Sequence, residues 1–145
     1  MKPCIFCRIA SGEIPAGIVF EDEETLAFLD HRPLFPGHCL LIPRGHMETL
    51  IDVPARLLSQ LSLKTRSLAI AMEKALSAQG AFIAINNRVS QSVPHVHIHV
   101  VPRTKGDALK GFFWPRQKYR DPEHMEEVRA ALERSMEQMA EGDKE

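Results

Sequence analysis

Three histidines alternate with apolar residues in the segment His95-Val96-His97-Ile98-His99. Side chains on a β-strand point alternately to its two faces, so a strand here places the three imidazoles on one face and the apolar side chains on the other. Neighbouring imidazoles on that face lie about 6–7 Å apart, which disfavours charging all three and spreads them too far for one tetrahedral metal ion. A solvated face that carries histidines by chance is the alternative, although valine, threonine or lysine would be more usual there. The spacing therefore predicts a polar site on one face of this strand.

Cys4 and Cys7 form a C-x-x-C pair near the start of the chain. This spacing suits a metal site or a redox pair, and the strand–helix context of a thioredoxin-like motif is missing around it. The third cysteine, Cys39, stands in an apolar run and is predicted to be a small buried residue of a strand. The pair is a candidate for metal ligation, with redox chemistry as the competing interpretation.

The composition is that of one soluble globular domain. The chain has 145 residues, of which 44% are hydrophobic and 26% are charged. Its 18 basic and 19 acidic residues give a net charge of -1, which argues against nucleic acid or an anionic membrane as the main partner. The opening residues lack the apolar run of a signal peptide, and no stretch approaches the roughly 18 apolar residues of a membrane span. We therefore expect a cytoplasmic protein.

Five predicted strands surround these candidate residues. The apolar segments 18–21 and 25–30 flank an acidic turn and predict a β-hairpin. Segments 38–42, 81–85 and 95–101 predict three further strands, and 38–42 is apolar throughout, as expected for a central, buried strand.

Two helices complete the predicted elements. Apolar residues recur at helical spacing over 54–78, with Asp52 as a possible N-terminal cap and Gly80 as a possible stop. A charged helix is predicted from 122 to about 140. Because the strands cluster instead of alternating with helices, the pattern predicts an α+β fold: a five-stranded, mostly antiparallel sheet with one long helix and a C-terminal helix.

The pattern His-φ-His-φ-His-φ-φ, in which φ is apolar, resembles the signature of the histidine-triad (HIT) family of nucleotide hydrolases and transferases. Segments 28–30 and 36–46 resemble two other blocks of that family, and 4–9 resembles the opening of its zinc-carrying bacterial branch. The resemblance covers residues 4–103. It implies a single HIT-like domain over 1–145, in which 103–145 is a partly irregular and helical C-terminal extension.

The resemblance implies a covalent mechanism. His97 would be the nucleophile that attacks the α-phosphorus of a nucleotide and forms a nucleotidyl-histidine. Its ring must be neutral, with its other N–H held by an acceptor that no sequence feature identifies. His99 would stabilise the phosphate or the leaving group, and His38 would be a further active-site histidine. The implied substrates are nucleoside phosphoramidates, dinucleoside polyphosphates or adenylylated compounds, with a purine base.

The resemblance also implies a set of substrate-binding residues: Asp30, Asn86, Asn87, Gln91 and Ser92, together with His99. The aspartate would bind the ribose hydroxyls, and one of the asparagines would reach the phosphate or ribose. Gln91 and Ser92 would bond the phosphate and the leaving atom, and apolar residues such as Phe6, Ile9 and Phe28 would flank the base. Ser90 stands where the family usually has glycine. From residue type alone, Asp30 is a turn-capping aspartate and His38 a strand-edge histidine.

In the zinc-carrying relatives the metal ligands correspond to Cys4, Cys7, His46 and His95. Four such ligands make a closed, structural zinc site. The family commonly dimerises through the long helix and a central strand, so a homodimer is expected. His31 and His124 receive no role, and Phe112-Phe113-Trp114 is a candidate partner surface or pocket. A nucleotide-binding or zinc-stabilised interaction protein with little turnover is the alternative to an enzyme.

Overall fold

The computed structural model describes residues 4–109 and 116–142. The chain divides into two compact units, Met1–Asp107 and Ala108–Glu145, and we describe each by itself. The aromatic segment Phe112-Phe113-Trp114 lies outside the described residues.

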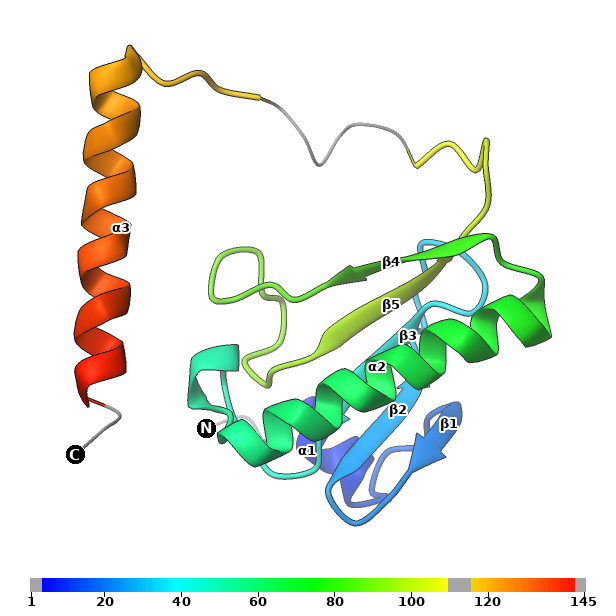
Figure 1. Cartoon of the computed structure of the whole chain (residues 1–145). Helices are drawn as coiled ribbons and strands as arrows, with labels where there is room; N and C mark the ends of the chain where they lie inside the picture. The colour runs from blue at the N-terminus through cyan, green and yellow to red at the C-terminus, as the bar shows by residue number, and fades with distance from the viewer. Residues whose placement is uncertain (1–3, 110–115, 143–145) are drawn as a thin grey trace. The chain divides into compact units, whose positions relative to one another are not determined.

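The first unit is built on one antiparallel sheet (Figure 1). Its strands follow the spatial order β1-β2-β3-β5-β4, so β3 is central, as its apolar sequence predicted. The bounds are β1 (Ile18–Glu21), β2 (Thr25–Leu29), β3 (Cys39–Pro43), β4 (Gly80–Ala84) and β5 (Ile98–Arg103). All four pairings are antiparallel, which confirms the predicted α+β class with a five-stranded sheet.

Each face of the sheet carries its own apolar core. The helix α2 (Ala55–Leu76) packs on one face, where it meets Cys39 and Leu41 of β3. The other face carries Leu40 and Ile42 of the same strand, which cluster with Phe6 from the short helix α1 (Ile5–Ala10). Figure 1 shows the two helices on opposite sides of the sheet. The alternation of side chains along β3 therefore separates a large core under α2 from a smaller core under α1.

The predicted range of the long helix, 54–78, is close to the observed one, but its predicted cap and stop residues were wrong. The carboxylate of Asp52 accepts hydrogen bonds from the backbone N–H and hydroxyl of Thr49, and so caps the 3-10 turn η1 (Leu50–Asp52) instead of α2. The helix stops because Ser77 adopts the left-handed conformation, at φ 56°, and Gly80 already belongs to β4. Asp52 could cap a helix, but it is used in the 3-10 turn. Gly80 could end one, but Ser77 ends the helix three residues earlier.

The helix α1 was not predicted. It has only six residues and one buried side chain, so it is too short to show an apolar period. A helix of this length is unstable in isolation and depends on its packing.

The second unit contains α3 (Pro122–Gly142), close to the predicted range. The carboxylate of Asp121 accepts a hydrogen bond from the backbone N–H of His124 at 2.7 Å, which caps the helix at its start. No described helix, in either unit, has the length and apolarity to cross a membrane.

The strand β5 begins at Ile98, whereas the predicted strand began at residue 95. The backbone N–H of Val96 donates to the carbonyl oxygen of Met47 at 2.7 Å, so the segment before the strand bonds the loop after β3 instead of the strand itself. The side chains still alternate: Val96, Ile98 and Val100 all pack into the core under α2. The histidines are thus left for the side of the sheet that carries α1.

Candidate active site and metal centre

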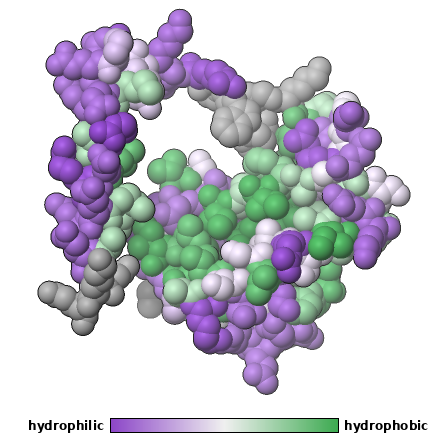
Figure 2. Space-filling model, viewed as in Figure 1, coloured by the Kyte–Doolittle hydropathy of each residue, from purple (hydrophilic) through white to green (hydrophobic). Residues whose placement is uncertain are grey.

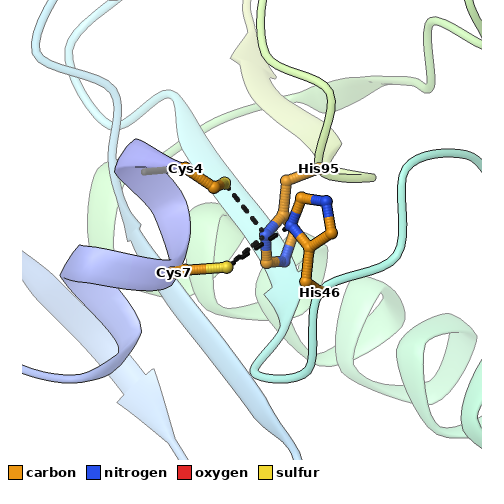
Figure 3. Close-up of side chains that lie close together, drawn as sticks. All are labelled: Cys4, Cys7, His46 and His95. Carbon is orange, nitrogen blue, oxygen red and sulfur yellow. Dashed lines mark hydrogen bonds between the residues drawn. The ribbon is translucent and has the colours of Figure 1, made fainter. Parts of the chain in front are cut away.

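Two cysteines and two histidines converge at the N-terminal end of α1 (Figure 3). Cys4 caps the helix and Cys7 lies one turn later, whereas His46 follows β3 and His95 precedes β5. Their four ligand atoms all lie within 4.8 Å of one another. The Nδ1 atom of His95 is 3.4 Å from the Cys4 Sγ and 3.5 Å from the Cys7 Sγ, and the Cys7 Sγ is 3.4 Å from the His46 Nδ1.

This donor set fits a tetrahedral zinc ion. Zinc–sulfur and zinc–nitrogen bonds at tetrahedral angles place the sulfur and nitrogen atoms about 3.6 Å apart, close to the distances found here. The Nε2–H of His95 donates to the carbonyl oxygen of Pro43 at 2.8 Å, which leaves the Nδ1 lone pair facing the sulfurs. Burial lowers the pKa of His95, so the ring is neutral, as a metal ligand must be. The site therefore suits a structural metal better than a redox pair, which needs no imidazole.

His97 lies next along the segment and is buried, with 4% of its surface exposed. Its Nδ1 atom is 2.8 Å from the backbone carbonyl oxygen of His95. A carbonyl can only accept, so Nδ1 carries a proton, and Nε2 is the nitrogen that carries the lone pair whenever the ring is uncharged. This carbonyl is the acceptor that the sequence could not identify, and Nε2 is the atom able to act as a nucleophile.

His99 and His38 form a chain of hydrogen bonds that begins at a backbone amide. The N–H of Leu34 donates to the Nδ1 of His38 at 3.1 Å, so His38 carries its own proton on Nε2. That Nε2–H then donates to the Nδ1 of His99 at 3.0 Å. Burial lowers the pKa of His38 and lowers the pKa of His99 to about 4, so both rings are neutral near pH 7. His99 therefore carries its proton on Nε2 and presents a donor there.

Asp30, His38 and His99 also bring three possible metal-ligand atoms within 4.8 Å of one another. The amide of Leu34 argues against a metal here, because it keeps the proton of His38 on the nitrogen that would have to ligate. Asp30 Oδ2 is 3.8 Å from that nitrogen, too far for a hydrogen bond, and Asp30 Oδ1 accepts from the backbone N–H of Arg32 at 2.9 Å. In both residues the partner of one ring nitrogen decides whether the other has a free lone pair. Pro43 leaves the lone pair of His95 free for a metal, whereas Leu34 occupies that of His38.

A cavity of about 340 Å³ lies beside these histidines on the side of the sheet that carries α1. Its polar lining comes from Asp30, His31, Ser92, His97 and His99. Its apolar walls come from α1, the loop before β1, and strands β2 and β3, and they include Phe6, Ile9 and Phe28. The volume and the mixture of apolar walls with a few polar groups are typical of a small-molecule site. Of the predicted site residues, the cavity brings together these seven: Asp30, Ser92, His97, His99, Phe6, Ile9 and Phe28.

His31 lines this cavity although the sequence assigned it no role. Its side chain is exposed and its Nδ1 lies 4.0 Å from Asp30 Oδ1. Its position next to Asp30 was the only signal that could have indicated it.

Three predicted substrate ligands lie elsewhere: Asn86, Asn87 and Gln91 are not among the described residues that line the cavity. The Oδ1 of Asn87 accepts from the backbone N–H of Leu50 at 3.0 Å. The Nε2 of Gln91 donates to the carbonyl oxygens of Glu48 and Val93. These two amides join the loop after β4 to the loop after β3, so their role in the structure is to connect the two loops. His38 is likewise absent from the described lining and reaches the cavity through His99.

The loop after β4 holds an uncommon backbone conformation. Arg88 has φ 70° and Ser90 has φ 60°, both in the left-handed region that glycine adopts most easily. The N–H of Arg88 donates to the Oε1 of Gln91 at 2.9 Å. A serine at position 90 therefore keeps the conformation for which a glycine is suited, at a cost in backbone strain.

Comparison with known proteins points to one family. The model of the HIT domain matches residues 11–106. An uncharacterised HIT-like protein of Methanocaldococcus jannaschii is 44% identical over 106 residues, which are 72% of this chain and 81% of that protein. The adenylylsulfatase of Arabidopsis thaliana is 35% identical over 108 residues, which are 73% of this chain and 55% of that protein.

A solved structure agrees. The crystal structure of a zinc-bound histidine triad family protein from Mycobacterium smegmatis superposes with a TM-score of 0.71 and 38% identity, and covers 93% of this chain and 96% of that one.

Proposed function

This chain belongs to the HIT family, and we propose that it is a hydrolase or transferase that acts at the α-phosphate of a nucleotide through a covalent nucleotidyl-histidine. The observation that carries the proposal is the hydrogen bond from His97 Nδ1–H to the His95 carbonyl oxygen, because it leaves Nε2 of a cavity-lining imidazole free to attack. Binding alone would not require this arrangement.

The proposed reaction has two displacements at phosphorus. The Nε2 lone pair of His97 attacks the α-phosphorus, and the bond to the leaving group breaks, with its electron pair going to the leaving atom. That atom takes a proton from water or from the hydroxyl of Ser92, which lines the cavity. Water then attacks the phosphorus, the P–Nε2 bond breaks and its electron pair returns to the ring. The proton that the attacking water loses goes to the hydroxide or to the Ser92 oxygen that gave up its proton in the first step. The proton stays on Nδ1 throughout and is donated to the His95 carbonyl oxygen, whose partial negative charge offsets the positive charge that the ring acquires.

His99 would serve as a hydrogen-bond donor to a phosphate oxygen. Its pKa of about 4 leaves the ring neutral near pH 7, with a proton on Nε2. A neutral imidazole is a weak acid but an effective N–H donor, so its role is to stabilise charge on the phosphate. His38 would be a positioning residue that holds this tautomer.

The substrate proposal follows from the rest of the lining. Asp30 would accept hydrogen bonds from the ribose hydroxyls, and a purine base would lie between Phe6, Ile9 and Phe28. Phosphoramidates, dinucleoside polyphosphates and adenylylated compounds share the required α-phosphate. The name of the Arabidopsis relative supports an adenylylated substrate among these.

We further propose that Cys4, Cys7, His46 and His95 hold a structural zinc ion. A bound zinc would cross-link α1, the loop after β3 and the segment before β5. The donor set and its distances support zinc, as does the zinc-bound relative from Mycobacterium smegmatis.

A cytoplasmic homodimer is the proposed form of the protein. Apolar surface gathers over α2 and β4 in the first unit, where Leu63, Ile70 and Ile83 are each nearly half exposed (Figure 2). Surfaces of this kind commonly mark subunit contacts. Light scattering over a range of concentrations tests the dimer.

Adenosine 5′-phosphoramidate is the first substrate to test. We expect the wild type to release AMP, and His97→Ala to lose at least about 10³-fold in rate. The reaction is not quenched with acid, because acid hydrolyses the phosphorus–nitrogen bond of the adduct. The adduct is sought by mass spectrometry at neutral or alkaline pH. Binding of AMP without turnover of any of the three substrate classes would favour the alternative of a binding protein.

A further inference from the structure

The helix α1 links the metal ligands to the nucleotide cavity. It is six residues long, is capped by Cys4, and contains Cys7. A helix this short has no stability of its own and takes its position from its attachments. Two of the four proposed metal ligands are among those attachments.

Phe6 is the only buried residue of α1. Its ring packs at steep angles against three others. The ring centroids are 5.9 Å from His95, 5.1 Å from His97 and 5.4 Å from Phe28, at interplanar angles of 71°, 85° and 69°. Edge-to-face contacts of this kind are directional as well as apolar. A single side chain therefore touches a metal ligand, the nucleophile and the wall of the cavity.

The same helix forms one wall of the cavity, through Ile5, Phe6 and Ile9. Its far end is held separately, since Arg44 Nη1 donates to the carbonyl oxygen of Ala10 at 2.9 Å. Loss of the metal would release the near end, where Cys4 and Cys7 lie, and leave that far contact and the packing of Phe6.

We propose that Phe6 couples the metal site to the nucleotide cavity, so that metal binding and nucleotide binding strengthen each other. The inference rests on the proposed function, because it requires a nucleotide in this cavity. A bound metal fixes α1 and with it Phe6, which in turn holds the cavity wall and the ring of His97. By thermodynamic reciprocity, a nucleotide that packs on this wall must stabilise the metal by the same factor.

A second route between the two sites runs through the backbone, because His95 accepts the hydrogen bond from His97. That route does not involve Phe6. Replacing Phe6 therefore separates the two routes, while all four metal ligands and the His97 hydrogen bond remain.

The test is an equilibrium competition for zinc. Zinc-loaded protein is mixed with a chromophoric chelator, with and without saturating AMP, and the zinc affinity is obtained in each case. For the wild type we expect AMP to raise the zinc affinity about tenfold, within the roughly 5–150-fold range of typical couplings. For Phe6→Ala we expect the factor to fall to the small remainder that the backbone route carries, and for Phe6→Leu, which keeps an apolar side chain, to lie between. Each titration starts from the zinc-loaded protein.

Ile9→Ala is the matched control. Ile9 also lines the cavity from α1 and packs against the core under that helix, whereas the ring contacts with His95 and His97 are made by Phe6. This variant should bind AMP more weakly by calorimetry and keep the wild-type coupling factor at saturation.

Two results would overturn the coupling: a factor near 1 in the wild type, or an unchanged factor in Phe6→Ala. The phosphoramidate assay separates this failure from failure of the function. Turnover without an AMP effect on zinc refutes the coupling alone, whereas an AMP effect without turnover supports the coupling and refutes the reaction.

Discussion

The Nδ1–H of His97 donates a hydrogen bond of 2.8 Å to the backbone carbonyl oxygen of His95. The residue proposed to ligate the metal through its side chain thus orients the proposed nucleophile through its main chain. His95 is itself held at both ring nitrogens, by Pro43 and by the sulfurs of the cysteines. The tautomer of the nucleophile is therefore set by a residue whose position the metal would fix.

Replacing His38 should impair catalysis through His99. In His38→Ala the Nδ1 of His99 loses its donor, so its proton can move to the nitrogen that faces away from the substrate. We expect kcat/KM for adenosine 5′-phosphoramidate to fall about 10–100-fold. His38→Gln, whose amide can still donate to His99, should recover part of the rate. The tautomer is read from ¹⁵N chemical shifts of His99, and an unchanged tautomer in His38→Ala would contradict the positioning role.

Removing one thiolate should abolish the metal site. Cys7→Ser is expected to lose stoichiometric zinc, measured by elemental analysis, and to lower the free energy of unfolding by several kcal/mol. Cys39→Ala is the control. Cys39 is a buried cysteine of the core under α2, outside the Cys4–Cys7–His46–His95 set. That variant should retain one zinc per chain. Zinc retained at full stoichiometry in Cys7→Ser would mean that the cluster is not the site.

Acid should destabilise the protein partly through His99. Its pKa is lowered to about 4 by burial and by the neighbouring His97 and His38, whereas an unfolded histidine titrates near 6.5. Between these values the unfolded chain binds the proton and the folded chain does not, so stability is complete above about pH 6.5 and falls as the pH drops toward 4.

The comparison for this prediction is His99→Asn. The free energy of unfolding of both proteins is measured in urea at each pH. Because metal loss affects both equally, it cancels in the comparison, and the free energy of the variant should fall less steeply with decreasing pH. Parallel curves for the two proteins would contradict the shifted pKa.

Replacing Ser90 by glycine should stabilise the loop after β4, because glycine adopts the left-handed conformation without backbone strain. At φ 60°, Ser90→Gly is expected to raise the free energy of unfolding by roughly 0.5–1 kcal/mol. Val89→Gly is the matched control, since Val89 is exposed and is not among the described residues with positive φ. That variant should be neutral or destabilising in urea titrations, and an equal gain in both would point to a general effect of loop flexibility.

The local pattern of the sequence determined the five strands, the two long helices and the face of the sheet to which the histidines point. Alternation along a strand is a property of consecutive residues, so it separated His97 and His99 from the apolar core without any tertiary information. The continuous apolar run at 38–42 predicted the central β3, and the resemblance carried by the motifs named the family.

Only the tertiary structure decided what each imidazole nitrogen does. The donors and acceptors that set the tautomers are backbone groups of Leu34, Pro43 and His95, and neither residue type nor spacing reveals where a backbone group will point. The short helix α1 could not be predicted for a related reason. Its position comes from the packing of Phe6 against side chains from distant parts of the chain, and six residues are too few to show a helical period of apolar residues.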